Sequence, residues 1–157
     1  MINILFVCTG NICRSPLAEG ILREKLKESN IPAGVDSCGF ESFHVGDQPD
    51  ARARSVAQAN GIDISGHRGR LFNQADFDHF DYIYAMDSSH YSNLMRLCRN
   101  GADRAKVDYV LNMVHPGQNC DVQDPWYHDM RAFEKVFQQL DEACSRIAAH
   151  IVAEQRK

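Results

Sequence analysis

This sequence lacks the features by which membrane and secreted proteins are recognised. No uninterrupted apolar run approaches the roughly 20 residues that a helix needs to cross a bilayer. No basic segment precedes the short apolar run at the N-terminus, so we expect no secretory signal peptide. The six cysteines form no C-x-x-C pair, and Cys8 and Cys13 lack zinc-ligand spacing. We therefore expect reduced thiols, no metal, no cofactor and a cytoplasmic location.

The sequence also has no excess of positive charge and no internal repeats. The formal net charge of −4 argues against a general nucleic-acid-binding role, because such proteins present basic surfaces. No repeat, linker or low-complexity segment divides the 157 residues, so we expect one domain over 1–157. The hydrophobic content of 44% is ordinary for a globular chain and is enough for a single core.

The most informative stretch present is a loop between an apolar strand and an amphipathic helix. Residues 2–7 are apolar except for one asparagine and predict a buried strand. Apolar residues at helical spacing predict a helix over 15–28, with Ser15 as its N-cap and Glu19 in its first turn. A loop that opens a helix presents unpaired backbone N–H groups, so this stretch predicts an anion site.

Two side chains of this loop have the chemistry to react with a bound anion. Cys8 ends the strand and Arg14 begins the helix, so a loop curled around one tetrahedral anion has the thiol at its floor. Inward amides, the helix dipole and Arg14 all favour the nucleophilic thiolate, and Arg14 can hold two phosphoryl oxygens. Gly10 and Asn11 tolerate the positive φ angles that turn amides inward. Ser15 can donate its hydroxyl to the sulfur. The alternative is a buried structural cysteine before a helix-capping serine.

The whole stretch C-T-G-N-I-C-R-S-P, residues 8–16, resembles the active-site loop of the low-molecular-weight protein tyrosine phosphatases. The resemblance implies that the loop binds the substrate's phosphate through Thr9, Gly10, Asn11, Ile12, Cys13 and Ser15. It also implies that Ser37 and His67 support the loop in a polar network, and that Asp87 orients the rim of the site. From the residues alone, Ser37 is a strand-end hydroxyl and His67 an exposed loop histidine.

A second motif supplies the acid that such chemistry requires. Transfer of a phosphoryl group to Cys8 expels an alkoxide or phenoxide, and an acid that protonates it contributes about 10²–10⁴ in rate. Asp124 is the candidate, followed by a proline and the pair Trp126-Tyr127, although Asp-Pro by itself is also a common turn initiator. This run resembles the family's general-acid loop, in which Trp126 and Tyr127 form walls for an aromatic ring. Phe43 matches a third wall position.

The rest of the chain alternates between predicted strands and helices. We expect strands over 2–7, 34–39, 82–86 and 106–113, and helices over 15–28, 49–60, 88–98 and 133–151. Such alternation predicts an α/β fold with a parallel sheet and helices on both faces. The resemblance implies an open four-stranded sheet of order 2-1-3-4, which places the Cys8 loop where the strand order reverses.

We therefore predict a metal-independent protein tyrosine phosphatase that acts through a phosphocysteine intermediate. Its expected partners are a phosphotyrosine-containing protein or peptide as substrate, and inorganic phosphate or another oxyanion as product or inhibitor. Alternatives are a phosphoarginine phosphatase, whose members carry Thr at the position of Ile12, and a thioredoxin-coupled arsenate reductase, which needs closely spaced downstream cysteines. A non-catalytic phosphate-binding or thiol-sensing module is the alternative from another class.

Cys13 has two interpretations. The resemblance favours a redox role, in which its thiol captures Cys8 as a disulfide after oxidation. The alternative is a small buried side chain at the start of a helix.

Overall fold

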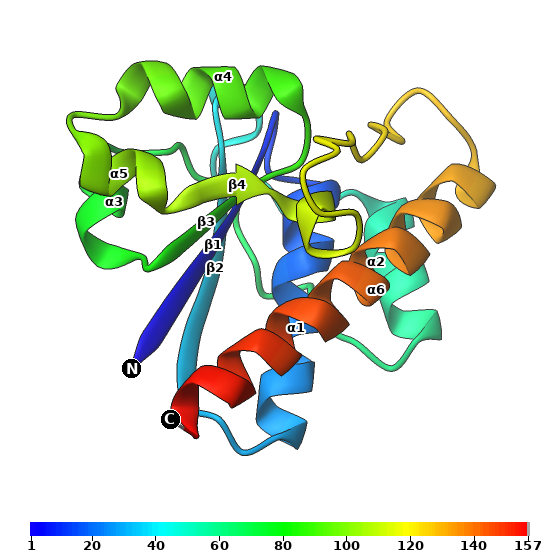
Figure 1. The fold of residues 1–157 in the computed structure, drawn as a ribbon. Helices are drawn as coiled ribbons and strands as arrows, with labels where there is room; N and C mark the ends of the chain where they lie inside the picture. Colours follow the sequence, from blue (N-terminus) through cyan, green and yellow to red (C-terminus); the bar gives the residue numbers. More distant parts are fainter. Residues whose placement is uncertain (157) are drawn as a thin grey trace.

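A computed structural model describes residues 1–156 and places a parallel sheet between two layers of helices (Figure 1). The strands are β1 (Ile2–Cys8), β2 (Ala33–Gly39), β3 (Tyr82–Ala85) and β4 (Val107–Tyr109). They pair in the order β2-β1-β3-β4, all parallel, which confirms the predicted fold class and strand order. Because β1 lies between β2 and β3, the loop that follows Cys8 starts where the strand order reverses.

Two apolar clusters cover the two faces of the sheet, because alternate side chains of β1 point in opposite directions. Ile4 and Phe6 pack with the helices α1 (Arg14–Glu28), α2 (Ala51–Ala59) and α6 (Met130–Gln155), which lie on one side in Figure 1. Leu5 and Val7 pack toward the other side, which carries α3 (Asp76–His79), α4 (Ser88–Leu97) and α5 (Gly101–Ala105).

The C-terminal helix α6 is amphipathic and longer than predicted. Its buried row is Phe133, Val136, Phe137, Leu140, Ala143, Cys144, Ile147, Ala148 and Ile151, and it packs against α1 and α2. This row at helical spacing confirms the helix predicted over 133–151. Within residues 1–156, no helix has both the length and the apolar character that crossing a membrane requires.

Several predicted boundaries were wrong, and two short helices were not predicted. The strand predicted over 106–113 stops at Tyr109, and the chain continues as the 3-10 helix η2 (Val110–Met113), which packs against α6. Residues 76–79 form the short helix α3, and α5 was not predicted. The cap of α4 is Asp87, because its carboxylate accepts from two backbone N–H groups of the first turn.

Candidate active site

The loop between β1 and α1 turns on Asn11, whose φ of 59° confirms the predicted left-handed conformation. Gly10 does not adopt a positive φ, so that part of the prediction was wrong. A Cβ at Gly10 would lie 3.1 Å from Cδ2 of His44, so a larger residue there would require the His44 ring to shift. Gly39 at the end of β2 is similar, since its Cβ would lie 2.5 Å from the Thr9 carbonyl oxygen. Close backbone approach therefore shapes the loop.

Ser15 lies beside the candidate nucleophile and does not cap the helix. Helix α1 begins at Arg14, and Cys13 stands in the cap position without a side-chain capping bond. The Oγ of Ser15 is 2.8 Å from the Sγ of Cys8, and both residues are buried. Asn11 donates from Nδ2 to the same Oγ at 2.8 Å, so the serine proton is free for another acceptor, and the sulfur is much nearer than the Cys38 carbonyl at 3.5 Å.

Asn11 is the centre of the polar network that supports the loop. Its Nδ2 donates to the Oγ of Ser37 at 3.0 Å, while its Oδ1 accepts from the Nε2 of His67 at 2.9 Å and from the Arg70 N–H at 3.1 Å. His67 is therefore not an exposed loop histidine, and its side chain is only 7% exposed. With all its polar groups engaged, the Asn11 side chain is fixed, which stabilises the positive φ of its backbone.

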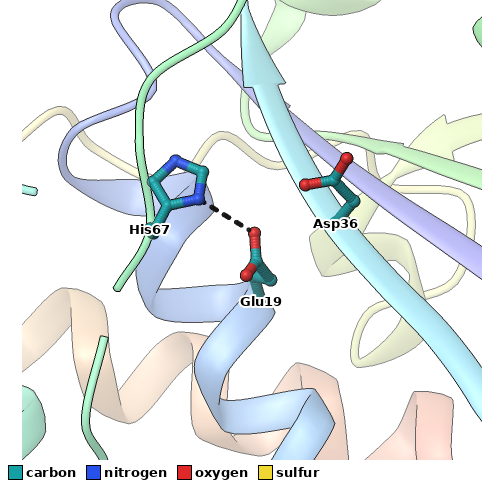
Figure 2. Close-up of side chains that lie close together, drawn as sticks. All are labelled: Glu19, Asp36 and His67. Atoms are coloured by element: carbon teal, nitrogen blue, oxygen red, sulfur yellow. Dashed lines mark ion pairs between the residues drawn. The ribbon is translucent and has the colours of Figure 1, made fainter. Parts of the chain in front are cut away.

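Glu19 completes this network, a role that its predicted place in the first turn of the helix did not suggest. It accepts from the Oγ of Ser37 at 2.8 Å and lies 3.2 Å from the Nδ1 of His67 (Figure 2). Burial raises the pKa of Glu19, but the hydrogen bonds from His67 and Ser37 outweigh burial and hold that pKa below its usual range. Glu19 thus supplies a buried negative charge that fixes the orientation of His67.

Glu19, His67 and Asp36 each bring one potential metal ligand within 4.8 Å of the others (Figure 2). Both nitrogens of the His67 ring already face acceptors, and the Asp36 carboxylate is paired with Arg70 at 3.0 Å. This donor set suits a hydrogen-bonded ion-pair network better than a metal ion, which needs a free lone pair on the imidazole. That the protein works without a metal stays a prediction.

The Arg14 side chain is only 2% exposed, and hydrogen bonds hold its guanidinium in a fixed position. Its Nη1 donates to the Asp87 carboxylate at 3.0 Å and to the Val122 carbonyl at 2.6 Å. Burial raises the pKa of Asp87, but hydrogen bonds from the Ser89 side chain, the His90 backbone N–H and the Arg14 guanidinium lower that pKa more, so Asp87 is ionised. The orienting role expected of Asp87 therefore acts through Arg14.

A second buried histidine, His90 on α4, contacts the loop and was not predicted from the sequence. Its Nε2 is 2.8 Å from the Oγ1 of Thr9, and its Nδ1 is 3.1 Å from the Asp87 carboxylate. Burial lowers the pKa of His90, Asp87 opposes this change and the charge of Arg14 adds to it, and the net result is a pKa of about 4. The ring is therefore neutral near pH 7. A single histidine within an amphipathic helix gives no sequence signal for such a contact.

Above the loop lies a pocket of about 270 Å³, and it brings the two sequence motifs together. Its lining residues are Cys8, Thr9, Gly10, Ile12, Cys13, Arg14, Glu41, Phe43, His44, Asp124, Trp126 and Tyr127. Asn11 and Ser15 of the loop are outside this lining, and so are Ser37 and His67, which hydrogen-bond to Asn11. Glu41 and His44 were not predicted, and no motif marks them in the sequence.

The candidate acid faces the candidate anion-binding residue across the pocket. Asp124 is 43% exposed, and its Oδ2 lies 3.8 Å from the Nη2 of Arg14. Its Oδ1 accepts from the backbone N–H of Trp126 at 3.0 Å, which orients the carboxyl group. The acid, the guanidinium and the thiol of Cys8 thus line one pocket, although Asp124 is more than 100 residues from the other two.

The aromatic walls differ in how firmly they are packed. The Trp126 ring is 5.5 Å from the ring of His44, which contacts Phe43 edge-on at 4.9 Å. Phe43 lies in the 3-10 helix η1 (Ser42–His44) and is 85% exposed, and Tyr127 is 88% exposed. Trp126 is therefore a fixed wall, whereas Phe43 and Tyr127 offer free aromatic surface at the mouth.

Cys13 is buried at the start of α1 and also lines the pocket. Burial raises the pKa of its thiol well above the usual range, and the nearby Asp50 carboxylate raises it further. Cys13 is therefore a neutral thiol near pH 7. All six cysteines are free thiols.

Comparisons with known proteins agree with this geometry. A model of the family described as low molecular weight phosphotyrosine protein phosphatase matches residues 3–157. A relative from Schizosaccharomyces pombe with that same description is 42% identical, over 88% of this chain and 90% of the relative. The crystal structure of a protein tyrosine phosphatase from Entamoeba histolytica has a TM-score of 0.91 at 30% identity and 99% coverage of both chains. YfkJ from Bacillus subtilis has a TM-score of 0.89 at 34% identity, covering 98% of this chain and 96% of its own.

Proposed function

Since this chain belongs to the low molecular weight phosphotyrosine protein phosphatases, we propose that Cys8, Arg14 and Asp124 are its catalytic residues. The protein is a cysteine-dependent protein tyrosine phosphatase, a hydrolase of phosphotyrosine monoesters that works through a phosphocysteine. The observation that supports the residue assignment is one pocket in which a thiol, a buried guanidinium and a carboxyl group meet. Each of the three groups has a separate task in the two steps of the reaction.

In the first step the Cys8 thiolate attacks phosphorus, forming the S–P bond as the bond to the tyrosine oxygen breaks. Asp124 gives its proton to that departing oxygen, so the leaving group is a neutral phenol. The loop amides and Arg14 bind the three equatorial oxygens, where negative charge gathers. Asp87 and the Val122 carbonyl hold Arg14 in place before the substrate arrives, so little reorganisation is needed.

In the second step the Asp124 carboxylate takes a proton from water, which attacks the phosphocysteine. The S–P bond breaks, phosphate leaves, and Cys8 regains its negative charge. Ser15 stabilises the departing thiolate, because its hydroxyl lies 2.8 Å from the sulfur and donates to it.

Substrate binding uses the same arrangement. Thr9, Gly10, Asn11, Ile12, Cys13 and Ser15 belong to the loop that receives the phosphate, with Ser37 and His67 supporting it. Phe43, Trp126 and Tyr127 then receive the tyrosine ring. Phosphoserine has a single methylene in place of the ring, so it reaches the floor only by dragging peptide backbone into the pocket. Unpaired backbone groups there cost roughly 1–3 kcal/mol each.

A substrate panel with purified protein in EDTA tests this function. Phosphotyrosine peptides should be hydrolysed, and phosphoserine peptides much more slowly. Cys8→Ser should abolish turnover while the fold persists, because a serine hydroxyl does not ionise here, and Cys98→Ser is the matched control. Equal kcat/KM for the two peptides would refute the tyrosine preference.

The other arms of the panel separate the alternatives. Preference for phosphoarginine, or reduction of arsenate coupled to thioredoxin, would move the chain to another activity on this fold. A failure to turn over any aryl phosphate would leave a phosphate-binding or thiol-sensing module.

We also propose three properties that accompany this function. Inorganic phosphate and similar oxyanions bind the Cys8 loop as product or inhibitors. Residues 1–157 act as one phosphatase domain. The protein works in the cytoplasm, where reducing conditions keep its six free cysteines reduced.

A further inference from the structure

The guanidinium of Arg52, near the start of α2, holds the segment that carries Asp124. Its Nη2 donates to the Trp126 carbonyl at 3.0 Å, and its Nη1 donates to the His128 carbonyl at 2.8 Å. The same group lies 5.6 Å from the centre of the Trp126 ring and 4.5 Å from that of Phe133. Three of these contacts hold the segment that follows the acid, and the fourth, with Phe133, ties the guanidinium to α6.

The Arg52 side chain is itself fixed by Asp50. Its Nε and Nη2 donate to the two carboxylate oxygens of Asp50, each at 3.1 Å, in a bidentate pair. The backbone N–H of Asp50 in turn donates to the Ile12 carbonyl at 2.8 Å. Because Ile12 belongs to the loop that carries Cys8, a continuous chain of hydrogen bonds joins the two halves of the active site.

The point of attachment is well placed to control the acid. The Trp126 N–H donates to the Oδ1 of Asp124 at 3.0 Å, and the carbonyl of the same residue accepts from Arg52. Arg52 thus restrains the residue whose N–H orients the carboxyl group of Asp124. Without Arg52, Trp126 would lose the polar partner of its carbonyl, and the Asp124 carboxyl would lose the fixed position of its donor.

We propose that Arg52 is a positioning residue for proton transfer. Through Trp126 it holds the Asp124 carboxyl within reach of the leaving oxygen, and through Asp50 it sets the position of that carboxyl relative to Cys8. This inference rests on the proposed role of Asp124 as the acid. A planar guanidinium is required, because one group must serve Asp50 and two carbonyls in fixed directions, which a lysine ammonium does not match.

Leaving-group dependence distinguishes positioning of the acid from a merely structural role. The value of kcat/KM reports formation of the phosphocysteine, the step in which the leaving oxygen departs. Phenyl phosphate expels a poor leaving group that needs a proton, whereas p-nitrophenolate departs readily as an anion. A loss of general stability lowers both rates together, but a misplaced acid lowers the rate for phenyl phosphate selectively.

The experiment measures kcat/KM for both substrates in Arg52→Ala, Arg52→Lys and the control Arg54→Ala. Arg54 is two residues further along α2 and donates to the Pro49 carbonyl instead. We expect Arg52→Ala to lower kcat/KM for phenyl phosphate by about 10- to 100-fold, the range that a small misplacement of a catalytic group causes. The value for p-nitrophenyl phosphate should change little, Arg52→Lys should lie close to Arg52→Ala, and Arg54→Ala should match the parent.

Combination with Asp124→Asn separates this inference from the assignment of the acid. Asp124→Asn should show the selective loss by itself, and adding Arg52→Ala should then cause no further selective loss. Equal losses for both substrates in Arg52→Ala, or a further selective loss in the double variant, would overturn the role of Arg52 alone. No selective loss in Asp124→Asn would overturn the acid assignment, and the role of Arg52 with it. Thermal unfolding checks the fold, and Arg52→Lys carries the test if Arg52→Ala does not fold.

Discussion

The Sγ of Cys8, which lines the pocket, and the Oγ of Ser15 lie 2.8 Å apart, and both residues are buried. Asn11 donates to the serine oxygen, so the serine proton is directed to the sulfur. A hydroxyl that donates to a thiolate stabilises it most when the sulfur carries full charge, which is the state in which it leaves phosphorus. We therefore expect the contact to accelerate the second step, in which the thiolate leaves phosphorus, more than the first step.

Ser15→Ala should accordingly slow hydrolysis of the phosphocysteine. We expect kcat to fall by about 10- to 100-fold, in line with the loss of one charge-stabilising donor, and kcat/KM for p-nitrophenyl phosphate to fall less. Rapid-quench measurements should show phosphocysteine accumulating. Ser29→Ala, an exposed serine at the end of α1, is the control. Equal effects on kcat and kcat/KM, without accumulation, would contradict this role.

The two aromatic walls of the acid loop should contribute unequally. Trp126→Ala removes a ring packed against His44, so we expect kcat/KM for aryl phosphates to fall up to about tenfold, from roughly 0.5–1.5 kcal/mol per aromatic contact. Tyr127→Ala should have a smaller effect because that ring is 88% exposed. Alkyl phosphates should be nearly unaffected by either change. A larger loss from Tyr127→Ala would mean that substrate orders the exposed ring.

Oxidation should reveal whether Cys13 protects Cys8. Peroxide should inactivate the protein, phosphate should protect it, a dithiol should restore it, and peptide mapping should find a Cys8–Cys13 disulfide. Because burial keeps Cys13 protonated, disulfide closure should accelerate as pH rises, by about tenfold per unit below the pKa of that thiol. If Cys13→Ser recovers as fully as the parent and the Cys120→Ser control, the protective role is wrong.

His90 should make the fold less stable in mild acid. Burial lowers the pKa of His90 from 6.5 to about 4, so between these values the unfolded chain binds a proton more readily than the folded one. This contribution to stability is complete above pH 6.5 and declines as pH falls toward 4. Between pH 7 and pH 5 the loss is about 2 kcal/mol, from about 1.4 kcal/mol per pH unit.

Urea unfolding at pH 7 and pH 5 checks this contribution. His90→Gln should lose less stability over that interval than the parent, whereas the exposed His79→Gln should behave as the parent does. The carboxylates of Glu19 and Asp87 have lowered pKa values, so their contributions are lost mainly below this interval. An unchanged difference between the two pH values in His90→Gln would show that His90 does not titrate on unfolding.

Local pattern was sufficient for the parts of this protein that are contiguous in the chain. An apolar strand, a loop with residues that tolerate unusual φ, and an amphipathic helix are adjacent in sequence, so residues 2–28 predicted the strand, loop and helix that the structure shows, with Cys8 at the end of the strand. The acid loop is likewise one short run at Asp124. The sequence misplaced Ser15, because an N-cap preference is a local tendency and the contact with Cys8 depends on how the whole loop closes.

Only the tertiary structure decided which distant residues hold these motifs in place. His90 reaches Thr9 across 81 positions of the chain, and Arg52 reaches Trp126 across 74. In sequence each is an ordinary polar residue on an amphipathic helix, and so is Glu19 before the fold brings His67 to it. Their roles arise from burial and from acceptors supplied by other segments. Those acceptors meet only when β1, β3 and the helices pack, and several are backbone carbonyls, which no residue type marks in a sequence.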